Sequence, residues 1–247
     1  ENKRAKARIR VLEILQEKGT LEKEILLKDA GTSMAVLKEL QEAGMISLQS
    51  ENIYRLPKIA REEKKQISLN IEQQAILDTF RNDLSENRIR NYLLHGVTGS
   101  GKTEVYMGML ESVLKTGKQA IVLIPEIALT FQTVMRFYGR FGDKVSVIHS
   151  KMSAGERYDQ MERAKRGEIS VMIGPRSAVF TPFSNLGMII IDEEHEGSYK
   201  SETNPKYHAR EVAKKRCEMS SASLVLGSAT PSIESYFQAS CGSYQLL

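Results

Sequence analysis

The stretch "NYLLHGVTGSGKTEVYMGMLESVL", residues 91–114, places a glycine-rich segment between an apolar run and an amphipathic run. Residues 96–103 match the pattern G-x-x-x-x-G-K-[ST], and the flanking runs supply the strand and the helix that this pattern requires. Glycines in such a loop let backbone N–H groups close around phosphates, and the N-terminus of the following helix favours the anion. The stretch therefore predicts a P-loop that binds ATP and Mg²⁺.

Two residues of this loop have individual roles in the prediction. Lys102 is expected to reach the β- and γ-phosphates, and Thr103 is expected to hold Mg²⁺. The residues predicted to bind ATP are Gly96, Val97, Thr98, Gly99, Ser100, Gly101, Lys102 and Thr103.

Short apolar runs recur on both sides of the loop, with helical stretches between most of them. A series of this kind predicts an α/β fold, in which a mostly parallel sheet is covered on both faces. Ligands of such sheets bind outside the carboxyl ends of the strands. The runs are "NYLLH" (91–95), "QAIVLIP" (119–125), "VSVIH" (145–149), "SVMIG" (170–174), "MIIID" (188–192) and "SLVLGS" (223–228).

Ionisable residues directly follow the run Met-Ile-Ile-Ile at residues 188–191. A P-loop enzyme needs an acidic residue at the end of a nearby strand for its Mg²⁺ shell, and Asp192 is predicted to fill that place. Glu193 would orient the attacking water. His195 alone would more often be structural, and its place in a catalytic group with Asp192 and Glu193 is implied by the resemblance given below. Ser228 and Thr230, at the end of a further strand, carry hydroxyls able to bond this group, and their segment resembles the helicase motif that couples the nucleotide site to DNA.

Residues 196–210 mix aromatic and basic side chains, and Gly197 and Pro205 exclude one continuous helix there. The mixture suits stacking on unpaired bases beside phosphate contacts, although the tyrosines would also fit plain packing. The residues of this loop predicted to contact DNA are Tyr199, Lys200, Tyr207 and Arg210.

The N-terminal residues 1–56 differ from the rest and predict a winged-helix domain. Three helical patterns precede "MISLQ" and "IYRL", which alternate like the two strands of a hairpin. "ENKRAKARIR" would form a basic arm. Groove binding by the third helix would place only Lys38, beside Glu39 and Glu42, near phosphates, so a scaffold or protein-contact role remains open. Residues 57–68 are charged and poor in large apolar side chains, which predicts a linker, and residues 69–247 form the P-loop domain.

The bulk composition is that of an ordinary globular protein. It is 41% hydrophobic and 27% charged, with a formal net charge of +4, which permits a nucleic-acid partner without requiring one. No apolar run approaches the roughly 18 residues that a membrane span needs. Cys217 and Cys241 are too far apart for a zinc motif, so a reducing cytoplasm is expected.

From about residue 70 onward, the motifs and their order resemble the PriA family of bacterial replication-restart helicases. A P-loop followed by Asp-Glu-x-His is typical of superfamily 2 helicases. The segments that carry the resemblance are "LNIEQ", "HGVTGSGKTEVY", "GKQAIVLIPEIALT", "IHSKMS", "IGPRSAVFTPF", "IIIDEEH", "SYK", "YHAREVA" and "LGSATPS".

The resemblance implies a RecA-like first helicase lobe preceded by a winged helix, in a 3′→5′ DNA helicase that acts at stalled replication forks. Gln73 would contact adenine. Single-stranded and forked DNA, other primosome proteins and single-strand-binding protein would be partners, and the aromatic-rich loop would sense DNA. The second lobe and a zinc module would lie outside this chain, so the chain should bind nucleotide and DNA without unwinding. The residues implied to line the DNA track are Pro125, Glu126, Thr130, His149, Ser150, Arg176 and Ser177.

Two other function classes fit parts of the pattern. One is a DNA-binding regulator whose P-loop domain only senses nucleotide, and the other is a different P-loop ATPase or a small-molecule kinase. Asp-Glu-Glu-His at 192–195 together with Ser-Ala-Thr at 228–230 argues against a kinase. DNA-stimulated ATP hydrolysis would separate the helicase from both.

We expect the winged helix to recognise DNA by shape, because Glu39 and Glu42 stand beside Lys38. Forks that differ only in arm sequence should bind the full-length protein with nearly equal affinity in a titration at constant salt. A preference above about tenfold, which is about 1.4 kcal/mol, for one arm sequence would contradict this expectation.

Overall fold

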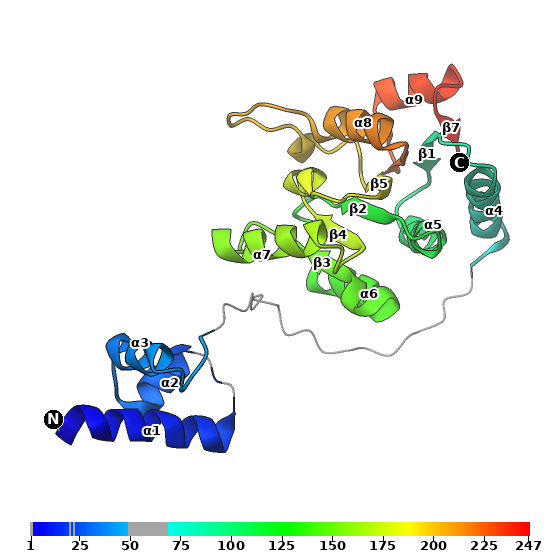
Figure 1. Ribbon diagram of the computed structural model, residues 1–247. Helices are drawn as coiled ribbons and strands as arrows, with labels where there is room; N and C mark the ends of the chain where they lie inside the picture. The colour runs from blue at the N-terminus through cyan, green and yellow to red at the C-terminus, as the bar shows by residue number, and fades with distance from the viewer. Residues whose placement is uncertain (1, 20, 22, 49–68) are drawn as a thin grey trace. The chain divides into compact units, whose positions relative to one another are not determined.

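The computed structural model describes residues 2–19, 21, 23–48 and 69–247, and the chain divides into two compact units, Glu1–Ile53 and Tyr54–Leu247 (Figure 1). The predicted linker 57–68 and the predicted strand "IYRL" lie outside the described residues. Within the part of the chain that is described, no helix combines the length and apolarity needed to cross a bilayer.

The smaller unit contains the three predicted helices, α1 (Asn2–Lys18), α2 (Lys23–Ala30) and α3 (Met34–Glu42). They pack around a small apolar core that includes Val11, Leu26 and Leu37. The basic N-terminal residues are the first turns of α1 and not a separate arm, because no helix breaker precedes Gly19. Residues 45–48, which were predicted to begin the hairpin, are not in a strand.

The larger unit is built on a sheet of seven strands that pair in parallel, with the order β3-β4-β2-β5-β6-β1-β7, and the predicted α/β fold with a mostly parallel sheet is confirmed. Each of the six apolar runs forms a strand. β7 was not predicted, because its two residues are too few to show a period. The strands are β1 (Asn91–His95), β2 (Gln119–Leu123), β3 (Val145–Val147), β4 (Val171–Gly174), β5 (Leu186–Ile191), β6 (Ser223–Ser228) and β7 (Gln245–Leu246).

Helices cover both faces of this sheet, and alternate strand residues serve opposite faces. In β5, Met188 and Ile190 pack with one helix layer, whereas Ile189 and Ile191 pack with the other. The first layer holds α4 (Ile71–Ser85), α5 (Lys102–Lys115) and α6 (Phe131–Phe141). The second holds α7 (Ala154–Lys165), α8 (Ala209–Ser220) and the 3₁₀ helix η2 (Arg176–Phe180). The remaining short elements are η1 (Gly142–Lys144), η3 (Gly197–Tyr199) and α9 (Ile233–Ser240).

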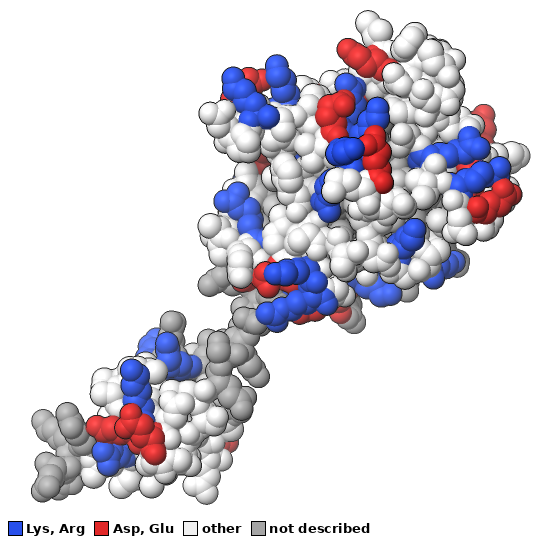
Figure 2. Space-filling model, turned by 45° about the horizontal axis from the view of Figure 1, so that its top comes forward, with Lys and Arg blue, Asp and Glu red and all other residues white. Residues whose placement is uncertain are grey.

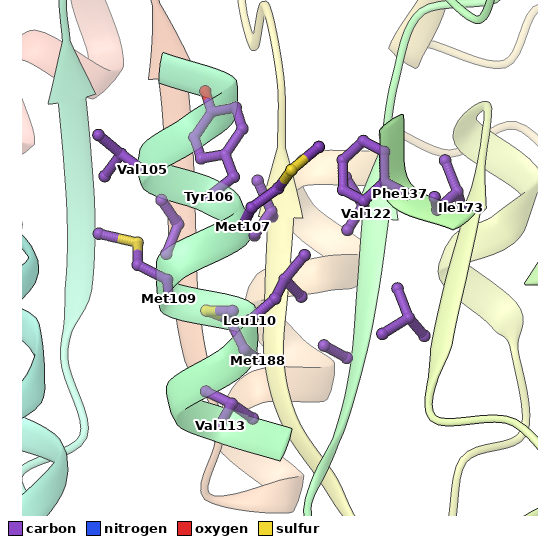
Figure 3. Packing of buried hydrophobic residues seen from close by; sticks show 14 of the residues in the cluster. Val105, Tyr106, Met107, Met109, Leu110, Val113, Val122, Phe137, Ile173 and Met188 are labelled. Carbon is purple, nitrogen blue, oxygen red and sulfur yellow. The ribbon is translucent and has the colours of Figure 1, made fainter. Parts of the chain in front are cut away.

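Helix α5, which follows the P-loop, is buried along most of its length. Its side chains Met107 and Leu110 face the strands that carry Val122 and Met188, as Figure 3 shows. This packing fixes the direction of α5, and its N-terminus therefore stays at the carboxyl end of β1, where the predicted site lies.

We predict that Gly227→Ala destabilises the larger unit, because an added Cβ in β6 would lie 1.5 Å from the hydroxyl oxygen of buried Tyr106. Overpacking of this kind costs about 1–3 kcal/mol, and a rigid tyrosine ring leaves little room to adapt. Gly197→Ala is the matched control, since its Cβ would meet nothing within 4 Å. Urea unfolding should show a lower midpoint for Gly227→Ala only. Equal midpoints for both variants would contradict the close contact.

Candidate nucleotide and DNA site

The P-loop takes the conformation that its glycines permit. Gly99 and Gly101 have φ angles of 81° and 86°, in the left-handed region that favours glycine. A Cβ on Gly101 would lie 2.3 Å from the amide nitrogen of Gln73. Lys102 begins α5, is 9% exposed and donates a hydrogen bond from Nζ to the carbonyl oxygen of Gly96 at 2.7 Å. The lysine thus lies across the loop that is predicted to hold the phosphates.

Gln73, in the first turn of α4, hydrogen-bonds the P-loop. Its backbone N–H bonds the side chain of Asn70, and its own side-chain oxygen accepts from the Asn70 N–H, which together form a capping box at the start of α4. Its amide nitrogen donates to the carbonyl oxygen of Ser100 at 2.8 Å. Gln73 therefore positions the loop, and its contact with adenine stays a prediction.

The predicted catalytic carboxylates lie at the end of β5. The Tyr106 hydroxyl donates to Oδ1 of Asp192 at 3.0 Å. Burial raises the pKa of Asp192, and this hydrogen bond opposes the shift. Glu193 has a φ of 46°, which is unusual for a residue with a side chain, and its carboxylate lies 3.8 Å from Nζ of Lys102.

His195 connects the end of β5 to the end of β6. Its Nδ1 lies 2.7 Å from the Ser228 hydroxyl and 3.8 Å from a carboxylate oxygen of Glu193. The Ser228 hydroxyl also accepts a bond from the backbone N–H of Thr230. The predicted bond between the hydroxyl segment and the catalytic group is therefore present through Ser228, whereas Thr230 takes part through its backbone.

The two candidate metal ligands, Thr103 and Asp192, fit a Mg²⁺ ion that binds together with a nucleotide. The described residues contain no group of three or more His, Cys, Asp or Glu side chains that would hold a metal. Mg²⁺ in P-loop sites takes one or two carboxylates, substrate phosphates and waters instead of a full protein cage. Asp192 at a strand end and Thr103 in the first turn of α5 are the residues expected to hold it.

Glu194 is a functional residue that the sequence analysis left without a role. It is 1% exposed, and its carboxylate accepts bonds from the Ser232 N–H, the Ser232 and Ser235 hydroxyls and the Arg210 guanidinium. The Glu194 N–H donates to the Gly227 carbonyl. The residue thus ties the end of β5 to α8, β6 and α9. Its partners are up to 41 residues away, so no local pattern signalled them.

Tyr106 is a second residue that the sequence analysis missed. It lies one turn into α5 and is buried, and its hydroxyl faces Asp192. Burial and the negative charge of Asp192 raise its pKa, so it remains a protonated donor. Its position four residues after Lys102 was the available signal, because residues four apart share a helix face.

The residues implied to line a DNA track follow β2, β3 and β4, which are neighbours in the sheet. Glu126 accepts a bond from the Ser150 N–H at 2.9 Å, and hydrogen bonding to Ser150, through its side chain first and its backbone second, lowers the pKa of Glu126. Thr130 caps α6 by accepting from the Thr133 N–H. The structure therefore brings the loops of Glu126 and Ser150 together, and DNA contact by this set stays a prediction. The other members of the set are Pro125, His149, Arg176 and Ser177.

Two of the residues predicted to contact DNA from segment 196–210, Tyr199 and Arg210, have structural partners instead. Tyr199 is 1% exposed, and its hydroxyl donates to the carbonyl oxygens of Leu123 at 3.0 Å and Asp192 at 2.6 Å. A base cannot stack on a ring buried in this way, so the packing alternative holds for Tyr199. Arg210 has a 16% exposed side chain and pairs with Glu194 at 3.0 Å, because a buried carboxylate needs a cation.

Lys200 and Tyr207 are less buried than Tyr199, and Tyr207 is partly buried against the second helix layer. Lys200 is exposed, with Glu202 3.8 Å away, and Tyr207 packs edge-on against Phe180 with ring centroids 5.0 Å apart. The loop between them forms no continuous helix, as predicted, and an antiparallel bridge joins Lys200 to His208.

Comparison with known proteins agrees with this geometry. The family model of the DEAD/DEAH box helicases matches residues 70–238. The chain is 51% identical over 224 residues to the replication restart protein PriA of Bacillus subtilis, covering 90% of this chain and 28% of that protein. It is 42% identical over 217 residues to PriA of Synechocystis, covering 85% and 25%. The resemblance predicted from the motifs is confirmed, and the chain spans about a quarter of the length of these relatives.

Solved structures show the same fold. RecG bound to a three-way DNA junction matches with a TM-score of 0.55 and 20% identity, covering 98% of this chain and 29% of RecG. A DEAD box protein from Methanococcus jannaschii matches with a TM-score of 0.52 and 21% identity, covering 70% and 48%. The larger unit thus has the fold of a RecA-like helicase lobe. With a family model that extends over more than half of its residues, the chain belongs to the DEAD/DEAH box helicases.

Proposed function

We propose that this chain is the first motor lobe, with its preceding winged helix, of an ATP-dependent 3′→5′ DNA helicase that acts in replication restart at stalled forks. The observation that carries the proposal is the chain of contacts across three strand ends, from Lys102 through Glu193 and His195 to Ser228. These contacts join the segment expected to bind phosphates to the segment expected to report on DNA. The similarity to the PriA proteins supports the proposed role in replication restart.

In the proposed hydrolysis of ATP, each side chain of the site has a separate role. Lys102 neutralises charge on the transferred phosphate, and Glu193 orients the attacking water as base. Bound Mg²⁺ supplies electrostatic stabilisation of the phosphate oxygens. Tyr106 fixes the orientation of the Asp192 carboxylate, since its hydroxyl is bonded to one of the two oxygens. The arginine that completes such a site from a facing lobe is proposed to lie outside this chain, and its absence would leave the chain a slow ATPase.

DNA binding is proposed along the ends of β2, β3 and β4, where hydroxyls, backbone N–H groups and Arg176 gather. On the face shown in Figure 2, Lys and Arg side chains of the larger unit stand in separate groups with Asp and Glu among them. That face carries no broad basic band, and the DNA contacts proposed are the local ones at the strand ends. Tyr207 and Lys200 are proposed to contact unpaired bases and phosphate from the 196–208 loop.

The whole protein is proposed to act in the bacterial cytoplasm. By similarity to PriA relatives, forked DNA, primosome proteins and single-strand-binding protein are proposed partners. Zinc is proposed only for a part of the protein outside this chain. The nucleotide-sensing regulator remains the second candidate, and the absence of DNA-stimulated ATP hydrolysis in the full-length protein would favour it.

We predict that Lys102→Ala and Glu193→Gln in the full-length protein differ in what they lose. Lys102→Ala should abolish hydrolysis and weaken Mg·ADP binding, because Lys102 is expected to contact phosphate. Glu193→Gln should bind Mg·ADP like the wild type but hydrolyse ATP about 10²-fold or more slowly, since it removes a base and leaves Asp192 intact. Calorimetric titration and a phosphate-release assay measure the two properties.

Lys215→Ala and Glu218→Gln are the controls for these substitutions. Both residues lie on α8 and are more than half exposed, and they pair with each other. Neither control should change hydrolysis or nucleotide binding. If Lys102→Ala and Glu193→Gln lost nucleotide affinity equally, the separate roles of Lys102 and Glu193 would be wrong.

A further inference from the structure

The backbone of Asp192, the predicted metal ligand at the end of β5, is held at both of its polar groups. Its N–H donates to the carbonyl oxygen of Leu123 at 2.9 Å. Its own carbonyl oxygen accepts a hydrogen bond from the Tyr199 hydroxyl at 2.6 Å. Because the backbone is fixed in this way, the two side-chain torsions are the main freedom left to the Asp192 carboxylate.

Tyr106 restricts these two torsions. Its hydroxyl donates to Oδ1 of Asp192 at 3.0 Å. The tyrosine is buried, and in Figure 3 its ring stands on α5 among the apolar side chains that this helix packs against the sheet. A ring enclosed by close-packed neighbours keeps its hydroxyl in one place. The carboxylate of Asp192 is therefore oriented by a donor that is itself fixed.

Gly227 in β6 provides the space that the Tyr106 hydroxyl occupies. A Cβ on Gly227 would lie 1.5 Å from the hydroxyl oxygen, so a side chain at this position would displace the hydroxyl. The Gly227 carbonyl accepts a hydrogen bond from the Glu194 N–H at 3.0 Å, which fixes β6 beside the end of β5. The position of this one hydroxyl is thus set jointly by α5, by β6 and by the end of β5.

Divalent cations differ in the geometry that they require of a carboxylate. Mg²⁺ requires a near-ideal octahedron with oxygens at about 2.0–2.1 Å, whereas Ca²⁺ accepts about six to eight oxygens at about 2.3–2.6 Å in flexible arrangements. A carboxylate that is already oriented loses little conformational freedom when an ion with strict geometry binds. Ca²⁺ gains less from this orientation, because it also accepts a carboxylate that moves.

We propose that Tyr106 makes the nucleotide site select Mg²⁺ over Ca²⁺, a proposal that rests on the nucleotide binding proposed above. Tyr106 acts through Asp192 and is a positioning residue. Thr103, the other residue expected to hold the ion, belongs to the same helix. Helix α5 therefore sets both the place of the Thr103 hydroxyl and the orientation of the Asp192 carboxylate. Without the Tyr106 hydroxyl, the carboxylate rotates and adapts to the larger ion.

The test is a calorimetric titration of the full-length protein with ADP, at concentrations of Mg²⁺ or Ca²⁺ that saturate the nucleotide. The wild type should bind ADP more tightly with Mg²⁺ than with Ca²⁺. Tyr106→Phe removes the hydroxyl and keeps the ring, so its affinity for ADP with Mg²⁺ should fall about fivefold, which corresponds to about 1 kcal/mol for one hydrogen bond. Its affinity with Ca²⁺ should stay the same, so the preference for Mg²⁺ should shrink by the same factor.

Tyr92→Phe is the matched control. Tyr92 is a buried tyrosine of the same apolar core, and its hydroxyl donates to Asp83 in the last turn of α4 at 3.0 Å. The substitution removes the same atom as Tyr106→Phe does, from a tyrosine that is not predicted to act on a metal ligand. It should lower the midpoint of urea unfolding and leave both ADP affinities unchanged.

The outcomes distinguish the role of Tyr106 from the nucleotide binding on which it rests. If Tyr106→Phe loses affinity equally with both ions, or keeps the wild-type preference, Tyr106 does not determine selectivity and the nucleotide site stands. A wild type that binds ADP equally well with both ions would overturn the proposal in the same way. If the wild type binds ADP with neither ion, the nucleotide site itself fails. Tyr106→Met gives the same comparison if Tyr106→Phe does not fold, because methionine lacks the hydroxyl and fills irregular gaps in a core.

Discussion

Parallel pairing of all seven strands is the constraint on which the rest of the larger unit depends. It places the carboxyl end of every strand at one edge of the sheet and forces each connection to return across a face, where the helices then lie. Residues far apart in sequence therefore meet at that edge. Tyr106 and Asp192 are 86 residues apart, and His195 and Ser228 are 33 apart, yet each pair is within hydrogen-bond distance. The predicted catalytic group is a consequence of topology more than of any single motif.

Burial at this edge explains why its carboxylates have hydrogen-bond partners within the protein. A carboxylate removed from water is costly unless donors surround it, and Glu194 has a guanidinium, two hydroxyls and a backbone N–H. Its network ties together the segments before and after β6. Asp192 accepts a side-chain hydrogen bond from Tyr106, and burial raises its pKa. A bound cation would stabilise its charged form. Lys102 meanwhile is held by a carbonyl of its own loop.

In the loop of residues 196–208, which precedes α8, aromatic and basic side chains have two different roles. Aromatic rings near cations suit contact with unpaired bases, but they suit anchoring against a core equally well. The two tyrosines divide these purposes: Tyr199 is buried and bonded to the backbone at the catalytic carboxylates, whereas Tyr207 packs on Phe180 at the surface of η2. Arg176 donates to the carbonyl oxygens of Ser198 and Lys200, which flank Tyr199. The loop proposed to contact DNA is thus hydrogen-bonded, through Tyr199, to the backbone next to Glu193, the residue proposed to orient water.

The sequence by itself determined the strands β1 to β6, the P-loop and the acidic strand end, because each rests on local periodicity or on a fixed spacing of glycine, lysine and carboxylate. It also indicated the family, since several such motifs occur in one order. Only the tertiary structure decided which polar residues meet. The pairing of Glu194 with Arg210, the burial of Tyr199 and the two-residue β7 depend on contacts between segments that the fold brings together. The same aromatic and basic residues can form a DNA-binding surface or pack against a core. Burial distinguishes the two, and no local sequence pattern records burial.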